Sequence, residues 1–170
     1  LSRRQRQMCI RDSLDIVGIN HPCQGIAIRD AVENAMMVLM PKREKPIYIN
    51  VEIGLDEDMG TAAGYMVEGS DTDEFDIFLR QDTLYDIEEL LLTVTHECIH
   101  IKQYLRRELR DINVDEKIWR GELYNTRDTY YKDCPWEQEA YLLQMPIANA
   151  VLKKYEDNKW PSEQQAVAQQ

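Results

Sequence analysis

Apolar and polar residues repeat with two different periods along the chain, and these periods predict helices and strands. Residues 24–40 carry apolar side chains every three or four positions, which predicts an amphipathic helix that ends at Pro41. A period of two follows in 47–53, and 75–79 places its largest apolar side chains on one face. Together with 62–68, these segments predict three β-strands.

The helical period returns in the second half of the chain. A long helix is expected to begin near Thr83, with Asp82 or Thr83 as its cap. Its apolar positions recur every three or four residues: Ile87, Leu91, Val94, Cys98, Ile101 and Leu105. Residues 111–131 show no clear period, and so long a connection is typical of a segment that shapes a functional site. A last helix is expected over 135–155, because proline is favoured in a first helical turn.

This order of elements predicts one α+β domain over residues 14–160. It would consist of an N-terminal helix, a small, mainly antiparallel three-stranded sheet, a long helix and a C-terminal helix, with a polar tail at 161–170. A length of 170 residues with 44% apolar residues suffices for one core. Residues 1–13 differ from the rest, because they are basic and their Met8–Ser13 run resembles one reading frame of a common sequencing-adapter oligonucleotide. We expect this segment to be non-native and outside the fold.

Charge and cysteine usage narrow the function classes. The net charge of −11 repels phosphate backbones, which argues against a nucleic-acid partner. No apolar run approaches the roughly 18 residues that suggest a membrane span, so no membrane partner is expected. The four cysteines lack the spacing of a zinc knuckle or a redox motif, which favours reduced thiols and a cytoplasmic location.

The expected long helix contains a short motif with chemical meaning, His96-Glu97-Cys98-Ile99-His100. Histidines four residues apart lie on one helical face, so both imidazoles can bind one Zn²⁺. Glu97 is rotated by about 100° from His96, which places its carboxylate beside the metal, where it can act as a general base. The motif also occurs by chance, but two of only three histidines have this spacing on an amphipathic helix. The sequence therefore predicts one zinc ion per chain.

A third protein ligand must come from another part of the chain. A third histidine would complete a metzincin pattern six residues after His100, but that position is Arg106, and the remaining histidine, His21, lies far upstream. We therefore expect a downstream carboxylate, which gives two histidines, one glutamate and an open position for water. The last helix is the rigid element that can carry it. It leaves Asp133 at its entry and Glu137 or Glu139 within it as candidates. Glu137 is the predicted ligand, and Glu139 is the alternative.

With these residues in place, the chain resembles the gluzincin-type zinc metallopeptidases, among them short peptidases of bacteriophage and bacterial genomes. The likeness rests on the His96–His100 motif, the Trp119-Arg120-Gly121 element and the run Pro135–Ala140. In gluzincins the first glutamate of such a run completes the zinc site, which implies this role for Glu137. Tyr141 departs from the pattern, since an acidic or amide residue is usual there. The resemblance implies a zincin-like fold and hydrolysis of a peptide or protein substrate, bound in extended form along an edge strand within 62–79.

Three functions stay open at this level. The first is peptide hydrolysis with Glu97 as the base, for which the candidates that would stabilise the oxyanion are Tyr124, Arg127, Tyr130 and Tyr131. The second is a zinc-stabilised structural or host-interaction module without catalysis. The third is a core helix with incidental histidines. Metal content separates the third from the others, and turnover of peptides separates the first from the second.

Overall fold

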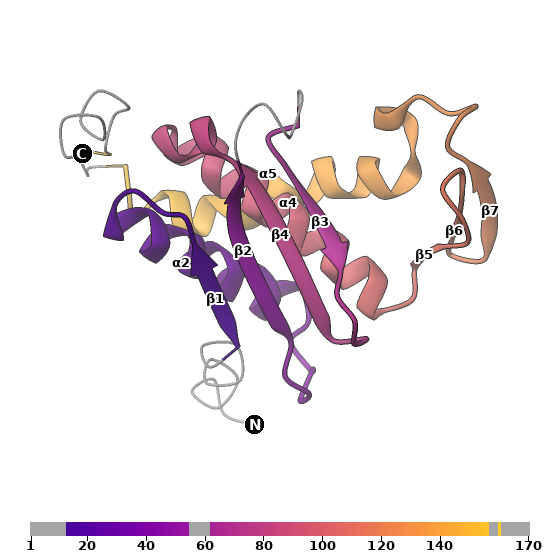
Figure 1. Ribbon diagram of the computed structural model, residues 1–170, viewed down its shortest axis with the longest axis horizontal. Helices are drawn as coiled ribbons and strands as arrows, with labels where there is room; N and C mark the ends of the chain where they lie inside the picture. The colour runs from indigo at the N-terminus through magenta and orange to yellow at the C-terminus, as the bar shows by residue number, and fades with distance from the viewer. Residues whose placement is uncertain (1–12, 55–61, 157–159, 161–170) are drawn as a thin grey trace.

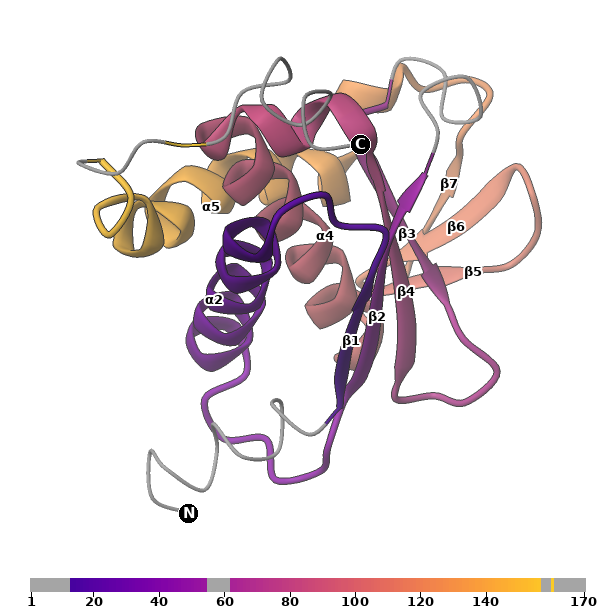
Figure 2. The ribbon, with the colours of Figure 1, turned by 60° about the vertical axis from the view of Figure 1, so that its left-hand side comes forward.

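The chain folds as an α+β protein in which the helices cover one face of a mixed sheet (Figures 1 and 2). The computed structural model describes residues 13–54, 62–156 and Trp160. The described residues form three α-helices, a four-stranded sheet and a separate three-stranded sheet. The small sheet lies beyond one end of the main sheet, at the right of Figure 1.

The main sheet has the order β1-β2-β4-β3, with strands β1 (Leu14–Val17), β2 (Tyr48–Gly54), β3 (Gly64–Glu68) and β4 (Glu74–Arg80). The predicted strands 47–53, 62–68 and 75–79 are confirmed within one or two residues at each end. The prediction of a three-stranded, mainly antiparallel sheet is wrong, because β1 pairs with β2 and β2 pairs with β4 in parallel. The first parallel pair is possible because a helix crosses over between β1 and β2. Only β3 runs antiparallel to its neighbour, and it forms an edge of the sheet.

One core holds the sheet against the helices. On β4 the side chains of Phe75, Ile77 and Leu79 are buried, and the residues between them are only partly buried. The inward face meets the apolar stripe of α2 (Pro22–Leu39), whose observed bounds extend the predicted helix by two residues at its start. Alternation with a period of two on the strands, and of three to four on the helices, directs all of these side chains into one layer.

Helix α4 (Ile87–Leu105) runs through the middle of the molecule and begins later than expected. The predicted start near Thr83 is wrong, because Gln81–Tyr85 forms a separate 3₁₀ turn, η1. Asp86 caps the helix instead: its Oδ1 accepts hydrogen bonds from the backbone N–H groups of Glu88 and Glu89, at 2.9 and 3.1 Å. A side chain that satisfies two unpaired N–H groups fixes the start of the helix more firmly than the apolar period does.

The expectation of irregular structure in 111–131 is also wrong. Strands β5 (Leu109–Asp111), β6 (Glu116–Trp119) and β7 (Glu122–Asn125) form an antiparallel sheet. A two-residue turn joins β6 to β7, and both of its residues have positive φ, 48° at Arg120 and 94° at Gly121. Strands of three or four residues are too short to show a period of two. The sheet covers a small second core of buried side chains: Leu109, Trp119, Cys134 and Trp136.

The last helix, α5 (Pro135–Leu152), follows the short 3₁₀ turn η2 (Tyr131–Asp133) and packs along α4 and α2. It extends as predicted from Pro135 but ends at Leu152, three residues before the predicted end. Helix α5 continues past Pro146. Among the described residues, no helix has both the length and the apolar character that a membrane crossing requires.

The predicted non-native segment 1–13 and the polar tail 161–170 lie outside the described residues, except for Ser13. The Ser13 carbonyl accepts a hydrogen bond from the Ile49 backbone N–H at 2.9 Å, and its hydroxyl donates one to the Ile47 carbonyl. Ser13 therefore belongs to the start of the sheet.

Substitutions at two leucines can test the packing of the helices on the sheet. Leu91 of α4 is fully buried in the core, whereas 73% of Leu142 on α5 is exposed. We predict that Leu91→Ala lowers the free energy of unfolding by about 2–5 kcal/mol, because it removes buried methyl groups and leaves a cavity. The control Leu142→Ala should change it by no more than about 0.5 kcal/mol. Denaturant unfolding of the metal-free protein measures both, and equal effects would contradict the packing of α4.

Candidate metal centre

Helices α4 and α5 bring the three predicted metal ligands together. His96 and His100 lie one turn apart on α4, and their Nε2 atoms are 3.1 Å from each other. Glu137, in the first turn of α5, places one carboxylate oxygen 3.2 Å from His96 Nε2 and the other 3.3 Å from His100 Nε2. All three side chains are buried, and this group could hold a metal ion.

The hydrogen bonds at Nδ1 determine the tautomer of both imidazoles. His96 Nδ1 lies 2.8 Å from Gln144 Oε1, and His100 Nδ1 lies 2.8 Å from Gln103 Oε1. An amide oxygen only accepts hydrogen bonds, so each Nδ1 must carry the hydrogen. In a neutral imidazole the lone pair is then on Nε2, the atom that faces Glu137. Metal-binding histidines are commonly oriented by such a hydrogen bond from the opposite ring nitrogen.

The donor set fits a divalent cation. Two lone pairs that face each other beside a buried carboxylate repel one another unless a positive charge lies between them. The observed separations of 3.1–3.3 Å also match a shared metal. Tetrahedral ligands at about 2.0–2.1 Å from a metal lie about 3.3 Å from one another.

The electrostatics of the group favour a cation as well. Burial disfavours the charged carboxylate of Glu137, but hydrogen bonds with His100 and His96 outweigh it and lower the pKa of Glu137 to about 2. Burial likewise disfavours a charged His100, yet the hydrogen bond with Glu137 and the charge of Glu97 raise its pKa overall. The surroundings therefore stabilise negative charge on Glu137 and positive charge on His100.

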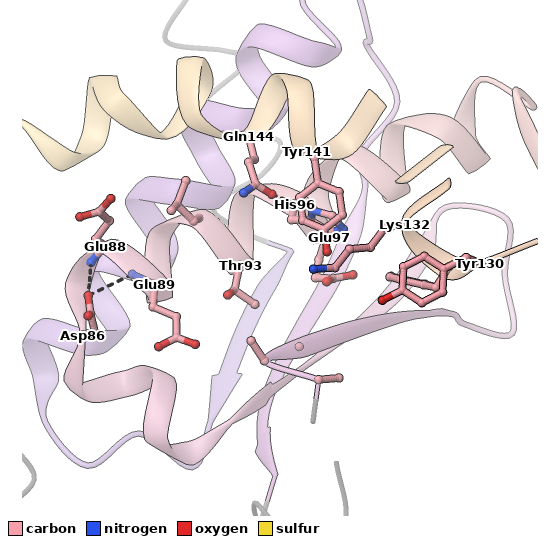
Figure 3. A pocket seen from close by; sticks show the side chains of 15 residues that line it. Asp86, Glu88, Glu89, Thr93, His96, Glu97, Tyr130, Lys132, Tyr141 and Gln144 are labelled. Atoms are coloured by element: carbon pink, nitrogen blue, oxygen red, sulfur yellow. Dashed lines mark hydrogen bonds between the residues drawn. The ribbon is translucent and has the colours of Figure 1, made fainter. Parts of the chain in front are cut away.

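Glu97 lies beside this group without joining it. Its side chain is almost fully buried, with 5% exposed, and it points toward the cavity beside His96 (Figure 3). Burial raises the pKa of Glu97, and the opposing influence of His100 and His96 only partly offsets it. A carboxyl group whose pKa is raised toward neutrality is suited to accept and return a proton.

Two cavities meet at the group formed by His96, His100 and Glu137, which we call the ligand group. The larger, of about 930 Å³, extends from His96 toward the start of α4, and the smaller, of about 300 Å³, lies toward the second sheet. Gly64 of β3, Glu97 and Tyr131 line both of them. The two cavities together form a cleft that passes the edge strand β3 and the ligand group.

The contacts of two other candidate metal ligands from the sequence show different roles for them. Glu139, the alternative ligand, contacts Lys102, Gln103 and Arg120 and is not part of the ligand group. His21 caps α2, where its ring accepts a hydrogen bond from the Cys23 backbone N–H.

Contacts and cavity lining also distinguish the four residues that were candidates to stabilise the oxyanion. The Tyr124 hydroxyl donates to Glu122, and Arg127 pairs with Asp115 at 2.8 Å. Tyr130 and Tyr131 line the larger cavity, and of the four candidates only Tyr131 also lines the smaller one.

Two residues of the site, Gln103 and Gln144, were missed in the sequence, and Tyr141 was noted only as a departure from the gluzincin pattern. Gln103 follows His100 by three positions, and Gln144 follows Glu137 by seven, so helical spacing places each on the same face as a ligand. Tyr141 packs edge-on against His96, with ring centroids 4.9 Å apart. At the position where the gluzincin pattern has an acidic or amide residue, this chain therefore has an aromatic contact. His96 Nδ1 instead donates a hydrogen bond to Gln144 Oε1, three residues later on the helix.

Comparisons with protein-family models, with curated proteins and with solved structures found no match to this chain. The resemblance to gluzincin peptidases therefore stays a prediction from short motifs.

We predict that the purified protein binds one divalent metal ion and that Glu137→Ala weakens binding by at least about 100-fold, because one of three ligands is lost. The matched control is Asp133→Ala, which removes an exposed carboxylate just before α5 and should leave the affinity unchanged. Isothermal titration with the metal-free protein measures both. Equal affinities for the two variants would contradict the assignment of Glu137.

Proposed function

We propose that this protein is a zinc-dependent peptidase in which Glu97 is the general base. The observation that carries the proposal is the convergence of His96, His100 and Glu137 within 3.3 Å of one another, with the Glu97 carboxylate beside them in an open cleft. Two imidazoles and one carboxylate are the donor set of several catalytic zinc sites that cleave peptide bonds.

The ligand number favours an enzyme over a structural module. Structural zinc sites are almost always closed by four protein ligands, whereas catalytic sites keep one position for water or substrate. Among the described residues, the group that could hold the ion has three members, and cavities adjoin it. A module that used zinc only for stability would not need a buried carboxylate beside the ion, since Glu97 is costly to bury.

Glu97 would move the proton that hydrolysis requires. Zinc, when bound, supplies a lowered pKa for water and a polarised scissile carbonyl. Glu97 accepts a proton from the attacking water and returns it to the nitrogen of the leaving amine. Its burial supports this role, because a raised pKa brings the base closer to the pH at which it must both take up and release a proton.

Strand β3 is suited to hold the substrate. Among the described residues it pairs with β4 on one side only, so its other edge can pair with an extended peptide. Gly64 lines both cavities, and Tyr65 and Met66 line the smaller one, so a peptide along β3 would pass the ligand group.

Tyr131 is the best candidate to stabilise the oxyanion. Partial burial of the phenol, then the charge of Glu137 and a hydrogen bond with it, raise the pKa of Tyr131, although 57% of the residue is exposed. Its hydroxyl therefore stays protonated at neutral pH. A protonated phenol can donate a hydrogen bond to the developing negative charge. Its position between the two cavities supports this role, since the scissile bond would lie there.

We predict that Glu97→Gln keeps stoichiometric zinc but lowers peptide hydrolysis by about 10²–10⁴-fold, because an amide cannot accept the proton from water. Zinc content by elemental analysis and turnover of a quenched peptide library measure the two properties. Turnover close to that of the unaltered protein would require another base.

We further predict that Tyr131→Phe lowers kcat by about 10²–10³-fold with a smaller change in KM and an unchanged zinc content, as expected for loss of an oxyanion donor. The control Tyr130→Phe removes a hydroxyl from the neighbouring residue, which lines only the larger of the two cavities, and should retain most of the activity. Similar kcat values for the two variants would argue against a specific role of Tyr131.

A further inference from the structure

A polar network that joins α4, α5 and the second sheet contacts Nδ1 of His100. We propose that Gln103 is a positioning residue that holds His100 in its metal-binding tautomer, and that Glu139 in turn holds Gln103. This proposal depends on the proposed metal site, but not on the reaction that the site catalyses.

Gln103 has only one orientation that satisfies its neighbours. Its side chain is fully buried, and its amide nitrogen donates to the Trp136 carbonyl at 2.9 Å and to Glu139 Oε2 at 3.0 Å. Both partners accept and neither donates, so the amide nitrogen must face them. The amide oxygen is thereby turned toward His100 Nδ1, at 2.8 Å. It keeps the hydrogen on Nδ1 and leaves the Nε2 lone pair for the metal.

Glu139 is held on both carboxylate oxygens. Its Oε2 accepts from Lys102 Nζ at 2.8 Å as well as from Gln103, and its Oε1 accepts from Arg120 Nη2. Lys102 is buried, with 5% exposed, so its charge needs a partner. A carboxylate fixed by two cations is a rigid acceptor for the Gln103 amide.

Arg120 connects the network to the second sheet and gives the Trp119-Arg120-Gly121 element a role. Arg120 has a φ of 48°, in the left-handed region that non-glycine residues rarely adopt. Its guanidinium lies 4.5 Å above the Trp119 ring, and its backbone N–H donates to the Glu108 carbonyl at 2.7 Å. These contacts hold the unusual turn in the conformation that directs Arg120 at Glu139.

The chain contains a matched control for Glu139. Glu108 also pairs with Lys102, at 2.7 Å, and with Arg120, at 3.5 Å. Glu108 and Glu139 thus share two cations, and Glu108 also lies 4.0 Å from Arg106. Of the two carboxylates, only Glu139 accepts a hydrogen bond from the Gln103 side chain. A role confined to fold stability would give the two carboxylates similar effects, whereas a positioning role toward the metal would separate them.

The experiment compares Gln103→Leu, Glu139→Gln and Glu108→Gln for zinc affinity, by competition with a chromophoric chelator, and for the melting temperature of the metal-free protein. We expect Gln103→Leu to weaken zinc binding by about 10–100-fold, the usual cost of losing a residue that orients a ligand. Glu139→Gln should weaken it in the same direction, and Glu108→Gln should bind zinc within about twofold of the unaltered protein. Both glutamine variants should melt at similarly lowered temperatures.

A second measurement reports the tautomer directly. In ¹⁵N NMR of the zinc-loaded protein, His100 should show a slowly exchanging Nδ1 proton, which exchanges rapidly with water in Gln103→Leu and less so in Glu139→Gln. If Gln103→Leu does not fold, the comparison of Glu139→Gln with Glu108→Gln still tests the proposal. Equal zinc affinities for these two variants, or a Gln103→Leu variant that binds zinc normally, would overturn the proposal.

The outcomes also separate this proposal from the proposed function. An unaltered protein that binds zinc but cleaves no peptide overturns the peptidase proposal alone, because zinc affinity still decides whether Gln103 positions His100. An unaltered protein that binds no zinc overturns both.

Discussion

Two imidazole nitrogens and a carboxylate lie buried within 3.3 Å of one another, and their mutual repulsion is the constraint on which the site depends. Such a group is stable only if a positive charge is shared among its members, whether a proton or a metal ion. Each surrounding contact then has an identifiable purpose: Gln103 and Gln144 direct the two lone pairs, and Tyr141 packs on the ring of His96.

The fold meets this constraint by packing α4 against α5. One face of α4 enters the core through Leu91, Val94 and Cys98, while the face that carries the histidines looks toward the cleft and α5. Helix α5 presents Glu137 in its first turn and Gln144 two turns later, so both meet α4 from one side. Two rigid helices that share a core hold the three candidate ligands more accurately than loops could.

The second sheet links the same site to a distant part of the chain. It closes the smaller cavity through Leu109 and Lys117, and through Arg120 it reaches the network that contacts His100. The segment that bounds the cleft and the segment that supports a ligand are therefore the same structural unit.

The sequence alone determined the features that depend on local spacing. The i,i+4 histidines, Glu97 beside them, the three strands 47–53, 62–68 and 75–79, and the apolar stripe of α4 all follow from helical and strand periods, which are properties of a few consecutive residues. The proline at the start of α5 likewise marked where the helix carrying Glu137 begins.

Tertiary structure decided what depends on distant residues. Strands of three or four residues, such as β1 and β5, form because neighbouring strands pair with them, and the parallel direction of β1 and β2 follows from the crossover of α2. Local patterns favoured Glu137 over Glu139 as the ligand but left both open. Both begin the same helix, and the packing of α5 on α4 points one toward the histidines, while Lys102 and Arg120 hold the other.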